Sequence, residues 1–261
     1  MLRILEIQMF LRTNNGQFFL QGLPIGDILL TFLGPGVVLF FTFYLLWAGR
    51  RKNHKIMELS REALLEVFQN EFKDLILDEK SSNGGLLYPK YKSRSIPFKD
   101  FRVVFALEER HLMLSVIISW FKGSNDYIAL EASPKKGKIP IKVQIIPKNE
   151  EGQIKKHQDL LFELDEVELG IKKLDDYFVM KATSNRTGTA MLGDKTLLKM
   201  IYSNRKVIVR ISINSADDPS IRVYARLNPE LDLNKLYHLF IALSERVNEF
   251  INKSVMKKKY S

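Results

Sequence analysis

The longest apolar stretch of the chain covers residues 28–48 and contains no side chain that is charged at neutral pH. A helix needs roughly 20 apolar residues to cross the hydrocarbon core of a bilayer, and this stretch has that length. Trp47 lies near its end, where aromatic rings favour the membrane–water interface. The pattern therefore predicts a transmembrane helix, with a kink or a break at Pro35. The alternative is a buried helix of a soluble core, where so long a charge-free run is unusual.

Positive charge is concentrated directly after this stretch, in Arg50, Arg51, Lys52 and Lys55. The segment before it carries two basic and two acidic residues, so it has no excess charge. Because basic flanks stay on the cytoplasmic side, we expect a single-pass protein with its N-terminus outside or in the lumen. The remaining chain is then cytosolic, at the cell membrane or the endoplasmic reticulum membrane. The four basic residues are expected to contact anionic lipid headgroups.

Hydrophobic periodicity predicts both helices and strands in the rest of the chain. Apolar residues at steps of three and four predict helices over 54–77, 109–121, 189–202 and 233–255. Period-two or β-branched runs predict strands over 101–108, 127–133, 139–146, 177–184, 206–213 and 221–227, with a further candidate at 160–169. The Gly-, Ser- and Pro-containing segment 78–97 predicts a loop. We therefore expect an α+β fold, a mostly antiparallel sheet packed with helices and closed by a long C-terminal helix.

These elements predict five parts of the chain. They are a short extracytoplasmic N-terminus (1–27), the transmembrane helix (28–48), a juxtamembrane helix and loop (49–97), a cytosolic α+β domain (98–252) and a basic tail (253–261). Whether the strand–helix–strand stretches 101–146 and 177–227 form one sheet or two small subdomains is open.

Net charge narrows the classes of partner. The chain has 40 Lys+Arg against 30 Asp+Glu, a formal charge of +10, all of it contributed after residue 48. Such an excess favours nucleic acid or an anionic membrane surface, although a lysine-rich proteome would produce it without a function. Four lysines at or beyond the last predicted helix are expected to contact ribosomal RNA or lipid phosphates: Lys253, Lys257, Lys258 and Lys259. A merely solvated tail is the alternative.

Catalytic and cofactor motifs are weak. The segment from Gly188 to Thr196 approaches a phosphate-binding loop, but Asp194 is inserted between the second glycine and Lys195. A helix start capped by Thr187 or Asp194 fits it better. The histidines lack metal-ligand spacing, and the absence of cysteine excludes thiolate chemistry and disulfides. We expect no enzyme activity, no cofactor, no metal and no small-molecule substrate.

The order of these features resembles calumin, the coiled-coil-containing subunit of the PAT complex of the endoplasmic reticulum. The resemblance rests on an apolar span, a basic segment directly after it, a helix with a Leu-Leu-Glu step, and the order of strands and helices up to a closing helix with a basic end. The segments that carry it after the span are, in chain order, Arg51–Lys55, Ala63–Glu66, Asn70–Phe72, Val103–Trp120, Tyr127–Ile146, Asp176–Met180, Leu197–Ile201 and Leu236–Ile251. The acidic lumenal region and the long C-terminal coiled coil of that family are missing, so no calcium role is carried over and the ribosome contact is in doubt.

The resemblance implies a membrane protein whose cytosolic domain docks at the ribosome–Sec translocon and assists insertion and folding of multi-span membrane proteins. Its partners would be the membrane, the translocon, the ribosomal RNA backbone and client transmembrane helices. Two alternatives stay open. One is a membrane-tethered adaptor that binds anionic lipid or another protein and is unrelated to translation. The other is an enzyme of unrecognised type.

Overall fold

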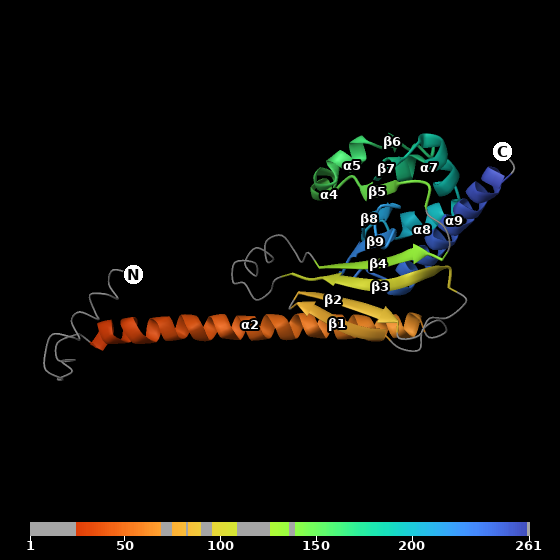
Figure 1. Cartoon of the computed structure of the whole chain (residues 1–261). Helices are drawn as coiled ribbons and strands as arrows, with labels where there is room; N and C mark the ends of the chain where they lie inside the picture. The colour runs from red at the N-terminus through yellow and green to blue at the C-terminus, as the bar shows by residue number, and fades with distance from the viewer. Residues whose placement is uncertain are drawn as a thin grey trace.

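The computed structural model describes residues 25–68, 75–81, 83–89, 96–108, 126–135 and 139–259 (Figure 1). Their secondary structure follows the chain in this order: α2 (Ile25–Val67), β1 (Leu75–Ser81), β2 (Gly84–Pro89), β3 (Phe98–Ala106), β4 (Tyr127–Pro134), β5 (Val143–Pro147), α4 (Glu151–Lys156), α5 (Gln158–Phe162), β6 (Asp165–Glu166), α6 (Lys172–Asp175), β7 (Phe178–Ala182), α7 (Asn185–Leu192), α8 (Lys195–Ser203), β8 (Ile208–Ile213), β9 (Ile221–Arg226) and α9 (Leu233–Lys259).

The strands of the described residues form one sheet, in the order β1-β2-β3-β4-β9-β8-β5-β7-β6. All neighbouring strands in it are antiparallel. At its centre, Leu130 of β4 lies opposite Val223 of β9, which in turn lies opposite Ile211 of β8. The two strand–helix–strand stretches thus belong to a single sheet. The predicted α+β fold with an antiparallel sheet is confirmed.

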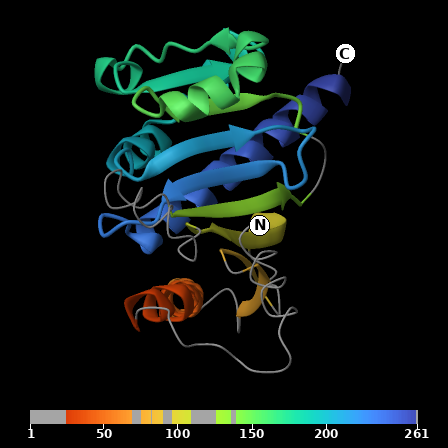
Figure 2. The same ribbon diagram turned by 90° about the vertical axis from the view of Figure 1, so that its left-hand side faces the viewer.

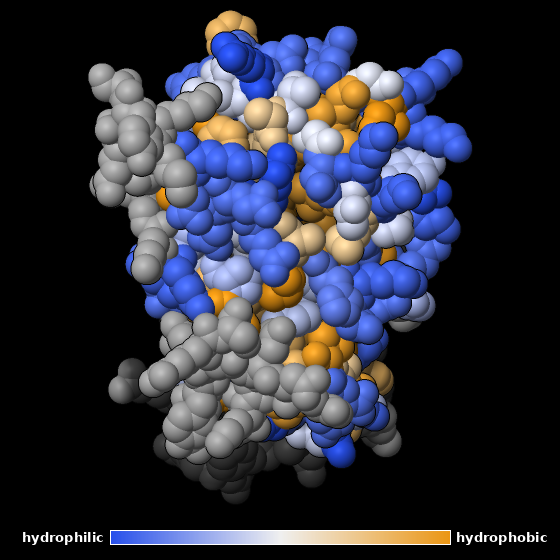
Figure 3. All heavy atoms as spheres, turned by 90° about the vertical axis from the view of Figure 1, so that its right-hand side faces the viewer, coloured by the Kyte–Doolittle hydropathy of each residue, from blue (hydrophilic) through white to orange (hydrophobic). Residues whose placement is uncertain are grey.

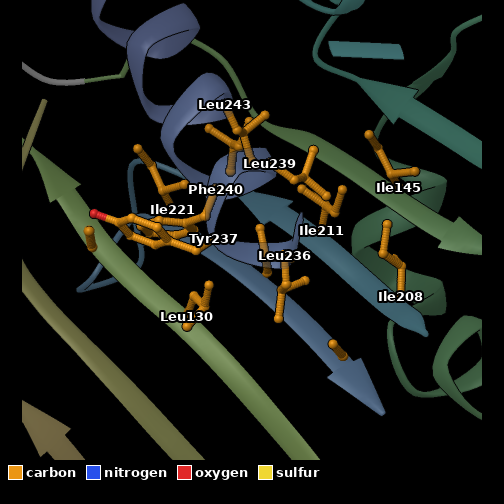
Figure 4. Close-up of a cluster of buried hydrophobic side chains, with 14 of the residues drawn as sticks. Leu130, Ile145, Ile208, Ile211, Ile221, Leu236, Tyr237, Leu239, Phe240 and Leu243 are labelled. Carbon is orange, nitrogen blue, oxygen red and sulfur yellow. The ribbon is translucent and has the colours of Figure 1, made fainter. Parts of the chain in front are cut away.

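Helix α9 covers one face of this sheet and supplies much of the core (Figure 4). Its residues Leu236, Phe240 and Leu243 are fully buried, as the spacing of three and four in the sequence predicts. They meet the inward side chains of the strands, among them Leu130 and Ile211 (Figure 4). Each fully buried large side chain of this kind contributes about 1.5–3 kcal/mol to folding.

Several predicted elements differ from the structure. Segment 78–97, predicted as a loop, contributes most of β1 and all of β2. The helix predicted over 54–77 ends at Val67, and the one over 189–202 is divided between α7 and α8. Segment 160–169 contains the end of α5 and only the two-residue strand β6. The helix predicted over 109–121 lies outside the described residues.

Two glycines lie inside a strand or a helix, although glycine by itself favours turns and loops, and both are closely packed. A Cβ atom on Gly85 of β2 would lie 2.7 Å from Sδ of Met57, so the strand closely approaches the Met57 side chain of α2. A Cβ on Gly188 of α7 would lie 2.4 Å from Cγ2 of Val167 and 2.8 Å from Cβ of Ala182. Glycine is therefore a packing requirement at Gly188, whereas at Gly85 the contact is with the flexible end of the Met57 side chain, which can shift.

The predicted transmembrane helix is corrected by the structure. Helix α2 continues through Pro35 without a break, and its side chains are described from Gly34 onward. In the part of the chain that the structure describes, no helix combines the length and the apolar character needed to cross a membrane.

Candidate functional site

Helix α2 has two halves with opposite surroundings. Its C-terminal half packs on the domain through the buried residues Asn53, Met57 and Leu64, and Phe68, directly after the helix, is buried as well. The Phe68 ring lies edge-on to Tyr237 of α9, with ring centroids 4.4 Å apart. The side chain of Asn53 donates a hydrogen bond of 3.0 Å to the backbone oxygen of Glu108. These contacts hold the direction of the helix relative to the sheet.

The N-terminal half projects beyond the domain, as Figure 1 shows. We call its residues 34–48 the apolar arm. Consecutive large side chains are exposed all around it, from Val37, which is 50% exposed, to Phe40, which is 68% exposed. The exposed large side chains of the arm are Val37, Val38, Leu39, Phe40, Phe41, Phe43, Tyr44 and Trp47. A contiguous exposed apolar patch of this kind marks a surface that a membrane or another molecule covers. Apolar residues that are exposed singly, in contrast, are normal on a protein surface.

The far side of the molecule has a different surface. Figure 3 views the molecule from the side opposite the arm, and hydrophilic residues dominate there with hydrophobic ones scattered between them. Among the described residues, eight of the twelve exposed large hydrophobic side chains lie on the arm. This asymmetry makes the arm the strongest candidate for a functional surface.

The four basic residues predicted to contact lipid lie where the arm meets the domain. Arg50, Arg51, Lys52 and Lys55 are all exposed, and we call them the basic collar. At about 100° per residue, they surround the helix except on the side of Asn53, which faces the domain. The guanidinium carbon of Arg51 lies 5.3 Å from the centre of the Trp47 ring, a cation–π contact that joins collar and arm.

One stripe of α2 also borders an open hollow. Its lining residues are Phe43, Leu46, Trp47, Arg50, Arg51 and His54. They follow one another at the spacings i, i+3, i+4, i+7, i+8 and i+11, so a single helix face passes from apolar to basic. The arrangement can place an apolar chain beside Phe43 and an anion beside Arg50.

The second predicted basic group lies elsewhere. Lys253 is exposed near the end of α9, and the backbone of Lys257, Lys258 and Lys259 continues that helix, while their side chains lie outside the described ones. In Figure 1 this end of the chain and the arm project from opposite sides of the domain. The structure therefore does not combine the collar and the tail into one site.

The stretch that resembles a phosphate loop is helical. Gly188 lies inside α7, Gly193 ends that helix, and Asp194 begins α8. A carboxylate oxygen of Asp194 accepts a hydrogen bond of 2.8 Å from the backbone N–H of Leu197, which is the predicted helix cap. The cap of α7 is Ser184 and not Thr187. A phosphate cannot be cradled by backbone N–H groups that are already bonded within α7.

A polar network on the other face of the sheet has no counterpart among the predicted sites. Glu131 of β4 is buried and lies between two cations, 2.7 Å from Nε of Arg102 and 3.5 Å from Nε of Arg222. On β8, Nε of Arg210 donates a hydrogen bond of 2.9 Å to the Gln144 side chain. The signal for this network was the alternation of β9, in which the polar residues Arg222, Tyr224 and Arg226 occupy every second position. Figure 2 shows that this face and the arm point toward the same side.

His157, between α4 and α5, is the partner of Arg210 in this network. Its Nε2 is in contact with Nη1 of Arg210, so the neutral ring accepts the hydrogen bond there. Burial and then the neighbouring Arg210 lower the pKa of His157 from 6.5 to about 4. Burial also lowers the pKa of Arg210 and raises that of Tyr224, whose ring centre lies 6.0 Å from that guanidinium carbon. The network is structural polar packing that favours neutral His157.

Among the described residues, no cluster of three or more His, Asp or Glu side chains could hold a metal ion. Comparison of the chain with models of known protein families and with curated protein sequences finds no significant match. The resemblance to calumin therefore stays a prediction, and the arm with its collar is the site on which a function can be argued.

Proposed function

We propose that this protein is a membrane-attached adaptor, which inserts the apolar arm into the hydrocarbon of a lipid bilayer and holds the α+β domain at the membrane surface. The observation that carries the proposal is the exposure of eight large apolar side chains around the arm, beside a collar of four cations. Apolar surface on all sides of a helix is covered by lipid more completely than by one protein groove, which contacts a single face.

The position of the collar supports the same arrangement. Lysine and arginine next to an apolar segment are attracted to anionic headgroups, by about 1 kcal/mol for each residue near the surface. Trp47, at the same level as the collar, has the amphipathic ring that favours the interface. Because Asn53 and Phe68 hold the other half of α2 on the domain, the arm would position the domain relative to the membrane.

Vesicle flotation of the full chain tests the proposal. The protein should float with vesicles of neutral phosphatidylcholine, through the arm, and more completely when an anionic lipid is added, through the collar. High salt should remove only the second effect, since it screens exposed charges and leaves apolar burial intact. Protein that stays at the bottom of the gradient with both kinds of vesicle would overturn the proposal.

A second candidate function follows from the placement of the basic end of α9 on the side away from the arm (Figure 1). A tail in that position would be free to contact a polyanion such as ribosomal RNA while the arm is in lipid, as a translocon-docking protein requires. Pull-down from native membranes across a salt series, probing for ribosomal RNA and the Sec channel, tests it. Recovery of both at low salt, with RNA lost steeply as salt rises, is the expected result. Recovery of neither would leave the adaptor without this role.

A further inference from the structure

We infer that the collar is not uniform, and that Arg50 and Arg51 form a headgroup site for a phospholipid with an exposed phosphate monoester. The inference rests on the proposed membrane attachment and goes beyond it, because general attraction to negative charge would use all four basic residues alike. Of the four collar residues, Arg50 and Arg51 border the hollow on α2, together with the described residues Phe43, Leu46, Trp47 and His54. Lys52 and Lys55 lie about 180° and 120° around the helix from Phe43.

The two arginines have the chemistry that a phosphate requires. A guanidinium offers a planar pair of N–H donors that matches two phosphate oxygens, whereas a lysine acts as a point charge. Among the described residues, neither Arg50 nor Arg51 forms an ion pair with a carboxylate. The Trp47 ring under Arg51 restricts that side chain without neutralising its charge. Two unneutralised cations beside each other match the charge of a phosphate monoester, about −1.5 to −2 at pH 7.

The apolar half of the stripe is the reason why we infer that the ligand is a lipid. Phe43, Leu46 and Trp47 continue the hollow toward the arm, one and two turns before the arginines. An acyl chain attached to the phosphate can follow these side chains into the bilayer, in the direction that the proposed insertion gives the arm. A free phosphate would use the arginines alone. The stripe therefore fits phosphatidic acid or a lipid with an equivalent terminal phosphate.

The test compares two double variants that remove the same charge. The full chain is mixed with phosphatidylcholine vesicles that contain phosphatidic acid or, at equal surface charge, phosphatidylglycerol. We expect about tenfold tighter binding of the wild type to phosphatidic acid, from the added charge-assisted hydrogen bonds. Arg50→Ala with Arg51→Ala should remove this preference. Lys52→Ala with Lys55→Ala should weaken binding to both kinds of anionic vesicle but keep the preference for phosphatidic acid.

Replacement of both arginines by lysine separates geometry from charge. Arg50→Lys with Arg51→Lys keeps the formal charge, so loss of the preference in this variant supports a guanidinium site. Equal effects of the two alanine pairs, or no preference in the wild type, would reduce the collar to a general charge effect. Removal of the preference by soluble glycerol phosphate, at the concentration of the lipid phosphate, would assign the arginines to a free phosphate instead. Binding to neutral vesicles tests the proposed membrane attachment separately, because it does not involve the collar.

Discussion

Replacement of Phe40 and Phe43 by alanine should weaken attachment to neutral vesicles and leave the fold intact. Both rings lie on the apolar arm and are 68% and 67% exposed. The nearest described ring to Phe40 is that of Phe41, with centroids 6.1 Å apart, which lies on the same arm. The domain core therefore does not depend on either side chain, and the thermal unfolding temperature should not change.

The size of the effect follows from the exposed area. Complete burial of a large apolar side chain contributes about 1.5–3 kcal/mol, and about two thirds of each ring is available to lipid, which gives about 1–2 kcal/mol per ring. The alanine methyl groups retain part of this, so the double variant should lose about 2–3 kcal/mol. At 1.4 kcal/mol for each factor of ten, vesicle binding should weaken roughly 30- to 150-fold.

Sedimentation with neutral phosphatidylcholine vesicles measures this loss without any contribution from surface charge. The matched control is Phe162→Ala on α5, because Phe162 is 89% exposed and is not part of the arm. That variant should bind vesicles as the wild type does. Binding of the double variant within about twofold of the wild type, or an equal loss in the control, would refute the arm as the lipid-binding element.

Three further changes test the domain, each by thermal or denaturant unfolding. Gly188→Ala should destabilise it by about 1–3 kcal/mol by overpacking, whereas Gly152→Ala, whose new methyl group meets nothing within 4 Å, should be neutral or slightly stabilising; equal effects would contradict the packing. Asp194→Ala should cost about 0.5–2 kcal/mol through loss of the α8 cap, and no loss would exclude that role. The native pKa of His157 is about 4 and lies below its ordinary 6.5, so the native state resists protonation and stability falls as pH drops from 6.5 toward 4. His157→Gln, which can still accept from Arg210, should reduce this fall by about 1 kcal/mol, since the ring is only partly buried; an unchanged pH dependence would refute the assignment.

Local pattern in the sequence was sufficient for elements whose surroundings are simple. The stripe of apolar residues predicted α9, whose Leu236, Phe240 and Leu243 are buried against the sheet. Strict alternation predicted β9, and the helix-capping role of Asp194 was predicted as one of two candidates. The positions of the collar residues beside an apolar stretch also followed from the sequence. Each of these features depends on residues within a few positions of one another, which is why periodicity and capping rules reach them.

The tertiary structure decided what depends on distant neighbours. Strands β1 and β2 contain turn-forming residues that predicted a loop, and Gly85 lies in a strand because it pairs with Glu79 of β1 and Phe105 of β3. The network around Glu131 required β3, β4 and β9 to become neighbours across the sheet. Apolar character alone indicated a membrane span, but the packing of Asn53, Met57 and Phe68 determined where α2 leaves the domain and which apolar residues remain exposed. The sequence pattern shows which side chains of a segment are apolar and can be buried. Only the folded chain determines which other elements pack against those side chains and which of them stay exposed.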